Sequence, residues 1–83
     1  MITHVAIVFR GETYSLPRPN RHHDVIRLIA EETDAKYIDG TEGFLVDGVR
    51  FVERTEALRH ALDVHQITAP KFQPHLLFSE DLW

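Results

Sequence analysis

The chain has 83 residues, enough for one domain, and we expect residues 1–83 to form it. Its formal net charge of −4 at pH 7 argues against a general electrostatic affinity for duplex DNA or RNA. Cysteine is absent, which excludes a disulfide framework, a thiolate nucleophile and a zinc finger. No apolar run approaches the roughly 20 residues that cross a bilayer, and the first residues do not resemble a signal peptide. We therefore expect a protein of a reducing cytoplasm, without a membrane partner.

The chain begins with the pattern of a β-hairpin. Residues 3–9 alternate and are rich in β-branched side chains, and residues 12–16 alternate polar and apolar, as a half-buried strand does. Arg10-Gly11 lies between them and suits a tight turn, because glycine supplies a positive φ. The sequence therefore predicts two antiparallel strands joined at this dipeptide.

A corner with two prolines leads from the hairpin into the first helix. Residues 16–20 read Leu-Pro-Arg-Pro-Asn, in which each proline fixes its own φ and holds the residue before it extended. Asn20 is a good N-cap, and apolar side chains then recur at helical spacing. We expect a helix from about Arg21 to Thr33.

The start of this helix is basic, although the helix dipole favours acidic side chains there. Free N–H groups and basic side chains at a helix start together form an anion-binding site. The corner therefore predicts a site for a phosphate-bearing ligand. The side chains that carry this prediction are Arg18, Arg21, His22 and His23.

The middle of the chain contains the clearest hairpin signal. Residues 34–43 are polar and glycine-punctuated, with Tyr37-Ile38 as the candidate for a short strand. Two apolar runs, 44–46 and 49–52, then flank Asp47-Gly48, a dipeptide typical of hairpin turns. A second hairpin is predicted here.

The last part of the chain is predicted to hold a second helix and a tail. Apolar side chains at helical spacing place the helix from residue 53 or 54 to Val64. Two later prolines make residues 68–83 an extended tail, packed on the core or on a neighbouring subunit. Trp83 either closes the core or packs on a second copy, and we expect self-association. The order hairpin, helix, hairpin, helix predicts an α+β fold, in which a small antiparallel sheet from two β-hairpins carries both helices on one face.

Six histidines raise the question of metal binding or catalysis. His22 and His23 are adjacent, so their side chains diverge by about 100° on a helix, and no His-x-x-x-His spacing exists. Ser15 and Ser79 lack the glycine context of a nucleophile elbow. We therefore expect no metal site, no cofactor and no catalytic residue.

The arginines are better suited to ligand binding, because a guanidinium can hold a phosphate through two hydrogen bonds. Arg50 and Arg54 lie at the second hairpin and at the start of the second helix. Phe44, Phe51 and Tyr14 are available to stack on a base, although core packing gives the same pattern. The predicted ligand-binding residues are Arg18, Arg21, His22, His23, Phe44, Arg50, Phe51 and Arg54.

Several short stretches also carry a family resemblance. The most specific are RHHDVI at 21–26, GFL at 43–45 with GVRFV at 48–52, and SEDLW at 79–83. Over nearly its whole length, the chain resembles the Thoeris anti-defense protein 1 family of small phage proteins. It departs from that pattern at the corner 16–20, where a glycine-lysine corner is expected, and at His65, where a glycine usually ends the helix.

The resemblance implies a sponge and not an enzyme. Members of that family bind cyclic nucleotide immune signals and hold them intact in the host cytoplasm. The implied ligands are cyclic ADP-ribose isomers made by TIR-domain proteins and, in some members, cyclic oligonucleotides made by cGAS-like enzymes. The resemblance also implies a homo-oligomer, a dimer or a hexamer, with sites at subunit contacts.

The sequence is also compatible with two other functions. A protein-binding inhibitor, such as an anti-CRISPR module, would imitate nucleic acid with acidic side chains gathered on one face. A cyclic nucleotide phosphodiesterase would use His22 and His23. The candidates for the acidic face are Glu31, Glu32, Asp34, Asp39 and Glu42.

Overall fold

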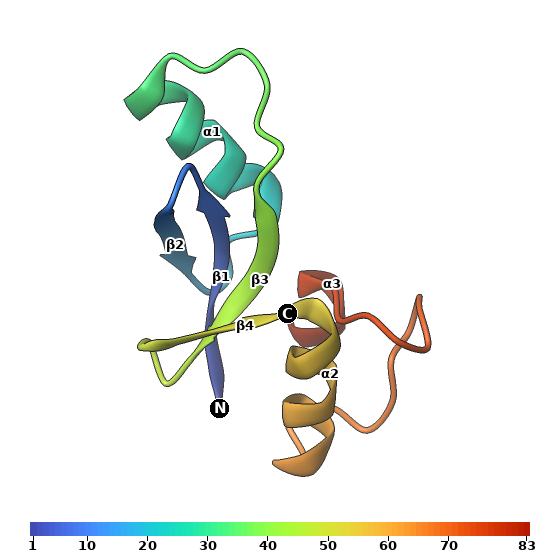
Figure 1. Ribbon diagram of the computed structural model, residues 1–83. Coiled ribbons are helices and arrows are strands. Elements are labelled where there is room, and N and C mark those ends of the chain that lie inside the picture. The colour runs from blue at the N-terminus through green and yellow to red at the C-terminus, as the bar shows by residue number, and fades with distance from the viewer.

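Four antiparallel strands form the centre of the protein in a computed structural model that describes residues 1–83 (Figure 1). Their order across the sheet is β2-β1-β3-β4, so β1 is hydrogen-bonded on both sides. The predicted α+β fold, a small antiparallel sheet from two hairpins with two helices packed against it, is confirmed. The strands are β1 Ile2–Phe9, β2 Glu12–Pro17, β3 Thr41–Val46 and β4 Arg50–Glu53.

Both hairpin turns use two successive residues with positive φ, as hairpin turns that match strand twist do. Arg10 (φ 53°) and Gly11 (φ 81°) join β1 to β2. In the second turn Asp47 has φ 52° and Gly48 has φ 73°. Val49 was predicted to start the next strand, but it belongs to the turn and is 84% exposed, because Val46 pairs with Arg50.

Helix α1 spans His22–Thr33, close to the predicted range, but its cap differs from the prediction. Arg21 and not Asn20 is the N-cap residue, and its backbone N–H donates a 2.8 Å hydrogen bond to Oδ2 of Asp24. Asn20 instead donates its side-chain amide to the carbonyl of Pro17 at 2.7 Å. The acid in the first turn therefore fixes the helix start, and the asparagine stabilises the corner before it.

The core lies between one face of the sheet and the two main helices. Helix α2 spans Arg54–Asp63 and packs on β3 and β4, while α1 packs on β1 and β2. Side chains from both helices join a single buried cluster with the strands, so the two helices cover the same face. The cluster contains Ile2, Val5, Ile7, Phe9, Val25, Ile29, Phe44, Val46, Val52, Ala57, Leu58, Ala61 and Leu77.

The segment between α1 and β3 contains no strand, although one was predicted at Tyr37-Ile38. Strand β1 is already paired with β2 on one side and with β3 on the other, so this segment cannot pair with it. Tyr37 is 86% exposed. The segment therefore crosses the end of the sheet as a loop before Thr41 starts β3.

The C-terminal segment differs from the extended tail predicted for residues 68–83, because Ser79–Leu82 form one helical turn, α3. Oδ2 of Asp81 accepts the backbone N–H of Phe78 at 2.9 Å, and Oδ1 accepts that of Lys71 at 2.8 Å. Leu77 is fully buried in the core. An aspartate that caps its own turn therefore stabilises a helix too short for a periodic signal.

Candidate functional site

The starts of α1 and α2 meet under the C-terminal segment. Arg21 and Arg54 approach this place from the two helices, and residues 78–80 run between them. We call this site the arginine junction and define it as Arg21, Glu42, Arg54, Phe78 and Glu80. It joins four segments of the chain: the start of α1, strand β3, the start of α2 and the C-terminal segment.

Arg54 is held from several sides. Its Nη2 donates to Oε1 of Glu42 at 2.5 Å, and its guanidinium carbon lies 4.7 Å from the centre of the Phe78 ring. Its backbone carbonyl accepts the N–H of Leu77 at 3.2 Å. The side chain is only 26% exposed, and its buried Nε has no hydrogen-bond partner. Arg54 is thus a positioned cation with one donor unsatisfied.

Arg21 is held more loosely. Its Nη1 lies 3.4 Å from Oγ of Ser79 and 4.0 Å from Oε1 of Glu80, so its ion pair is long. The pKa of Glu80 is lowered by its own backbone N–H, then by the Ser79 hydroxyl and by Arg21, against an opposing effect of burial. The junction therefore presents a carboxylate of the chain itself to Arg21.

His22 lies beneath the junction in the core. Its Nε2 is 2.8 Å from the carbonyl oxygen of Gly43, and its ring packs edge-on to Phe44 at 5.0 Å between centroids. Burial lowers the pKa of His22, while the Gly43 carbonyl acts in the opposite direction. His22 is 7% exposed and Phe44 is fully buried, so the structure gives both a packing role.

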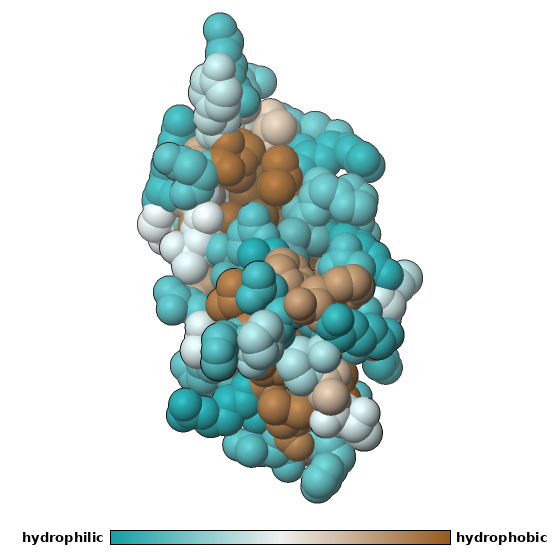
Figure 2. All heavy atoms as spheres, turned by 90° about the vertical axis from the view of Figure 1, so that its right-hand side faces the viewer, coloured by the Kyte–Doolittle hydropathy of each residue, from teal (hydrophilic) through white to brown (hydrophobic).

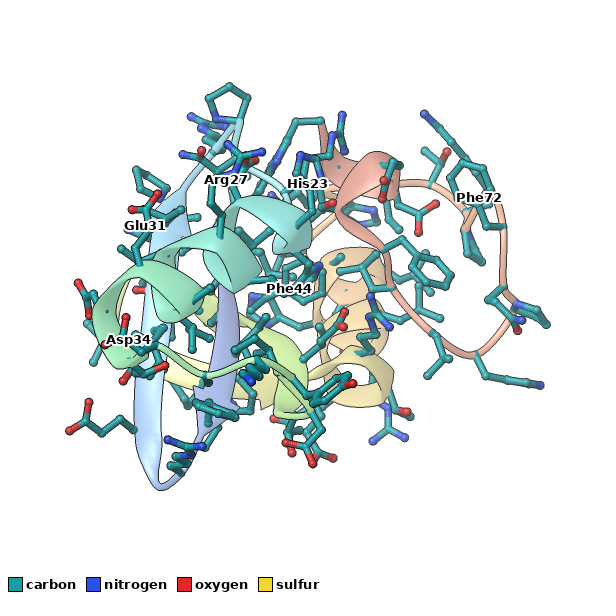
Figure 3. The ribbon with its side chains drawn as sticks, turned by 90° about the horizontal axis from the view of Figure 1, so that it is seen from above. His23, Arg27, Glu31, Asp34, Phe44 and Phe72 are labelled. Atoms are coloured by element: carbon teal, nitrogen blue, oxygen red, sulfur yellow. The ribbon has the colours of Figure 1, made fainter.

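The other predicted binding residues do not join the junction. Arg18 is exposed at the corner, and His23 points to solvent beside Asp24, with its side chain 67% exposed. Figure 3 shows His23 at the start of α1, above Phe44. Arg50 pairs with Glu56 at 2.7 Å on α2. Phe51 packs against Gly43, opposite Leu45, on the face of the sheet that the helices leave uncovered.

A hollow of about 400 Å³ opens beside the junction, lined by Phe72, Phe78 and Glu80. Phe72 is 63% exposed and meets Phe78 edge-on at 6.1 Å. Figure 2 views this side of the molecule, where small hydrophobic areas lie among hydrophilic side chains. The hollow offers an apolar wall next to two cations.

Sequence reasoning did not select four residues of the junction and of the hollow beside it. They are Glu42, Phe72, Phe78 and Glu80. A signal for Glu80 existed, because the SEDLW stretch is one of those that carry the family resemblance. The pairing of Glu42 with Arg54 had no signal, since it depends on how β3 and α2 pack.

The structure also bears on the alternative functions. Glu42 is paired with Arg54, so it does not belong to an exposed acidic face. Glu31 is exposed in the last turn of α1, and Asp34 is exposed just after the helix ends (Figure 3). Within residues 1–83, no three His, Asp or Glu side chains are arranged to hold a metal ion. No helix combines the length and apolar character that crossing a membrane requires.

A family model described as "Phage T4 y16D protein" matches residues 1–83. No curated protein and no solved structure matches significantly. Because the family match spans the whole chain, the protein belongs to the phage T4 y16D protein family.

Proposed function

We propose that this phage-family protein binds a nucleotide-like immune signal at the arginine junction and sequesters it without cleavage. One observation carries the proposal: Arg21 and Arg54, from two different helix starts, converge on the same short segment, Phe78–Glu80. Two guanidinium groups at one place form an anion site even in a chain of net charge −4.

The chemistry of the junction suits a phosphate next to a base. A phosphate that replaces the carboxylate of Glu80 would gain hydrogen bonds from Arg21, whose present contact to Glu80 is 4.0 Å. The hollow lined by Phe72 and Phe78 supplies an apolar wall for a planar ring. Its volume of about 400 Å³ lies in the range of about 300–1,000 Å³ usual for small-molecule sites.

The arrangement favours sequestration over hydrolysis. A phosphodiesterase based on His22 and His23 needs both rings near the ligand, but His22 is buried against the Gly43 carbonyl. His23 faces solvent, and its Nε2 lies 3.4 Å from Oδ1 of Asp24. The two histidines therefore do not form a paired acid and base beside the two arginines.

The family resemblance supplies the class of ligand and the setting. We propose cyclic ADP-ribose isomers or cyclic oligonucleotides as ligands, in the host cytoplasm. We also propose a homo-oligomer, a dimer or a hexamer, in which a second copy covers the exposed ring of Phe72 at the edge of the site.

The test is calorimetric titration with a panel of cyclic nucleotides, followed by heat denaturation and chromatography of the released ligand. We expect one class to bind and to be recovered unchanged. Arg21→Ala should weaken binding at least about ten-fold, since charged hydrogen bonds contribute about 1.5–3 kcal/mol. Arg59→Ala, an exposed cation on α2 outside the junction, is the matched control.

Two results would contradict the proposal. Absence of binding to every cyclic nucleotide, with a host protein bound instead, would favour the acidic inhibitor. A cleaved product in the released ligand would favour the phosphodiesterase. The molecular mass in solution, measured on the same sample, tests the oligomer.

A further inference from the structure

We propose a second anion-binding site, distinct from the arginine junction, between the tip of the first hairpin and the loop after α1. Its ligand class is a phosphate monoester of a sugar that also carries an aromatic base, as in a nucleoside monophosphate. The site shares no residue with the junction, so it goes beyond the proposed function and does not depend on it.

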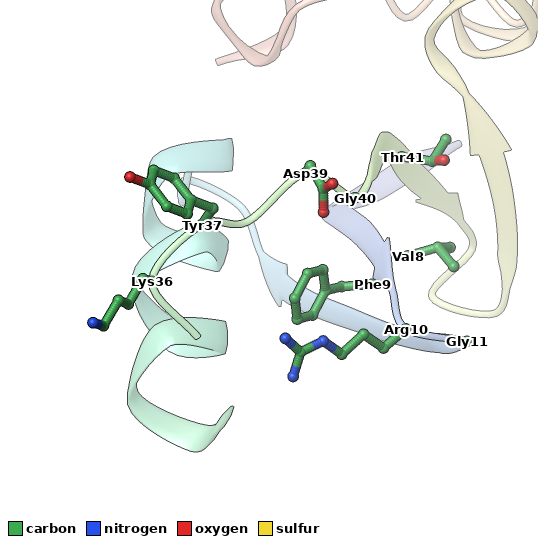
Figure 4. A pocket seen from close by; sticks show the side chains of 9 residues that line it. All are labelled: Val8, Phe9, Arg10, Gly11, Lys36, Tyr37, Asp39, Gly40 and Thr41. Atoms are coloured by element: carbon green, nitrogen blue, oxygen red, sulfur yellow. The ribbon is translucent and has the colours of Figure 1, made fainter. Parts of the chain in front are cut away.

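The site is the largest hollow of the molecule, with a volume of about 520 Å³. One wall is the hairpin tip, residues 8–11, and the other is the loop, residues 36–41. Figure 4 shows Arg10 and Asp39 reaching into the space between the two walls, with Phe9 beside them. Lys36 and Tyr37 also line the hollow, and in this view their side chains point away from the hairpin tip (Figure 4).

The loop wall is fixed in place by Gly40. A Cβ at this residue would collide with the carbonyl oxygen of Val8 and lie 2.7 Å from Cγ2 of Ile7. Only glycine therefore lets the loop approach β1 this closely. The hollow is consequently a built feature of the fold, bounded by a loop that is held against the sheet.

The positive charges of this hollow have no ion-pair partner in the chain. Arg10 lies with its guanidinium carbon 4.8 Å from the centre of the Phe9 ring, and neither Arg10 nor Lys36 is in an ion pair. The carboxylate of Asp39 forms no ion pair either. No backbone N–H of residues 36–40 donates to a carbonyl of the loop or its surroundings. The hollow is thus lined by two cations that form no ion pair with the chain.

Arg10 is also an unusual residue for its backbone position. It has φ 53° at the first central position of a hairpin turn, where Asn, Asp or Gly is favoured. A left-handed conformation is unfavourable for a long side chain. The turn therefore does not explain the arginine, whereas a ligand in the hollow does.

The remaining side chains indicate the class of ligand. Tyr37 is 86% exposed at the rim, and an exposed ring reorients fast enough to cover a bound base. Asp39 can accept a hydrogen bond from a sugar hydroxyl, but it repels a highly charged polyphosphate. Two cations against one carboxylate therefore fit a monophosphate best.

The test uses adenosine monophosphate as the probe, titrated at low ionic strength into isotope-labelled full-length protein and followed by NMR. We expect shifts concentrated in residues 8–11 and 36–41. Arg10→Asn removes the cation but suits the turn, so the fold should be kept, and binding should weaken at least ten-fold. Tyr37→Ala should weaken it several-fold, while Arg59→Ala, an exposed cation on α2 outside both sites, should leave it unchanged.

Adenosine and inorganic phosphate separate the two parts of the ligand, and both should bind more weakly than the monophosphate. Equal affinity for adenosine would overturn the anion site, and equal affinity for inorganic phosphate would overturn the role of the ring. Unchanged affinity in Arg10→Asn, or no shifts at these residues, would overturn the whole proposal. None of these outcomes concerns cyclic nucleotide binding at the junction, so the two proposals fail separately.

Discussion

The indole Nε1 of Trp83 donates a 2.8 Å hydrogen bond to the carbonyl oxygen of Asn20. This bond joins Trp83, which follows α3, to Asn20, which precedes the N-cap residue of α1. Together with the bond from the Leu77 N–H to the Arg54 carbonyl, it ties the C-terminal segment to the starts of both main helices. The geometry of the arginine junction therefore depends on residues 77–83.

Trp83→Phe removes this hydrogen bond but keeps an aromatic ring. We expect the free energy of unfolding to fall by about 0.5–1.5 kcal/mol, the net contribution of one hydrogen bond. Urea denaturation measures this fall in the free energy of unfolding. Phe72→Tyr, at a ring that is 63% exposed, is the control and should leave stability unchanged. Equal stability of Trp83→Phe and the parent would show that the bond does not hold the segment.

Leu77→Ala tests whether the C-terminal segment belongs to the core. Leu77 is fully buried, so its truncation should cost about 2–5 kcal/mol. Val64→Ala, at a side chain that is 42% exposed, should cost well under half of that. The prediction is wrong if chemical denaturation gives the two variants the same loss.

Gly43→Ala tests the close approach of β4 to β3. A Cβ at this position would collide with the Val52 carbonyl oxygen and lie 2.6 Å from the Phe51 ring. Because a backbone oxygen cannot move aside cheaply, we expect a loss of at least about 2 kcal/mol. Adding Phe51→Ala should recover only part of the loss, since it clears the ring but not the carbonyl. Full recovery in thermal unfolding would show that the ring alone limits the space.

The buried ring of His22 predicts a pH dependence of stability. Burial lowers its pKa in the folded protein below the usual 6.5, so the unfolded chain takes up this proton first on acidification. Stability should therefore fall as the pH drops below about 6.5 and stop falling, for this group, below the folded pKa. His22→Gln should show a shallower fall between pH 7 and 5 in denaturation at several pH values. An unchanged slope would assign the effect elsewhere.

Glu80→Gln should strengthen nucleotide binding at the junction. The change removes the negative charge that lies 4.0 Å from Arg21, so a ligand phosphate no longer competes with it. Partly exposed ion pairs contribute about 0.2–1 kcal/mol, which corresponds to at most about a five-fold gain in affinity. Glu53→Gln, an exposed acid outside the junction, is the control for calorimetry. Weaker binding by Glu80→Gln would contradict this prediction and would show that the ligand binds to the carboxylate of Glu80.

The hairpins and helices could be predicted because their signals are local. Arg10-Gly11 and Asp47-Gly48 mark the turns, and the helical spacing of apolar residues marks α1 and α2. The N-cap was predicted at Asn20, which is the wrong residue. The cap lies at Arg21 because the backbone N–H of Arg21 donates to Asp24, and residue type alone does not reveal that hydrogen bond. The local sequence pattern was sufficient to predict an element wherever residues close in sequence decide its conformation.

The site was only partly predictable because its parts meet through tertiary packing. Arg21 and Arg54 were both selected, but their convergence depends on Phe78 and Glu80, which follow Arg54 by more than 20 residues. Arg50 and Phe51 were selected as well, but Arg50 pairs with Glu56 and Phe51 packs against Gly43, so neither reaches the junction. Contacts between distant segments decide that point, and a single sequence does not record them.

The position of β1 inside the sheet has a consequence for slow motions. Its backbone is bonded on one side to β2 and on the other to β3, and the pair Val5–Phe44 spans almost half the chain. Opening this strand requires both pairings to separate, which amounts to global unfolding. The amide protons of β1 should therefore be among the last to exchange with deuterated solvent, long after those of the loop that carries Tyr37.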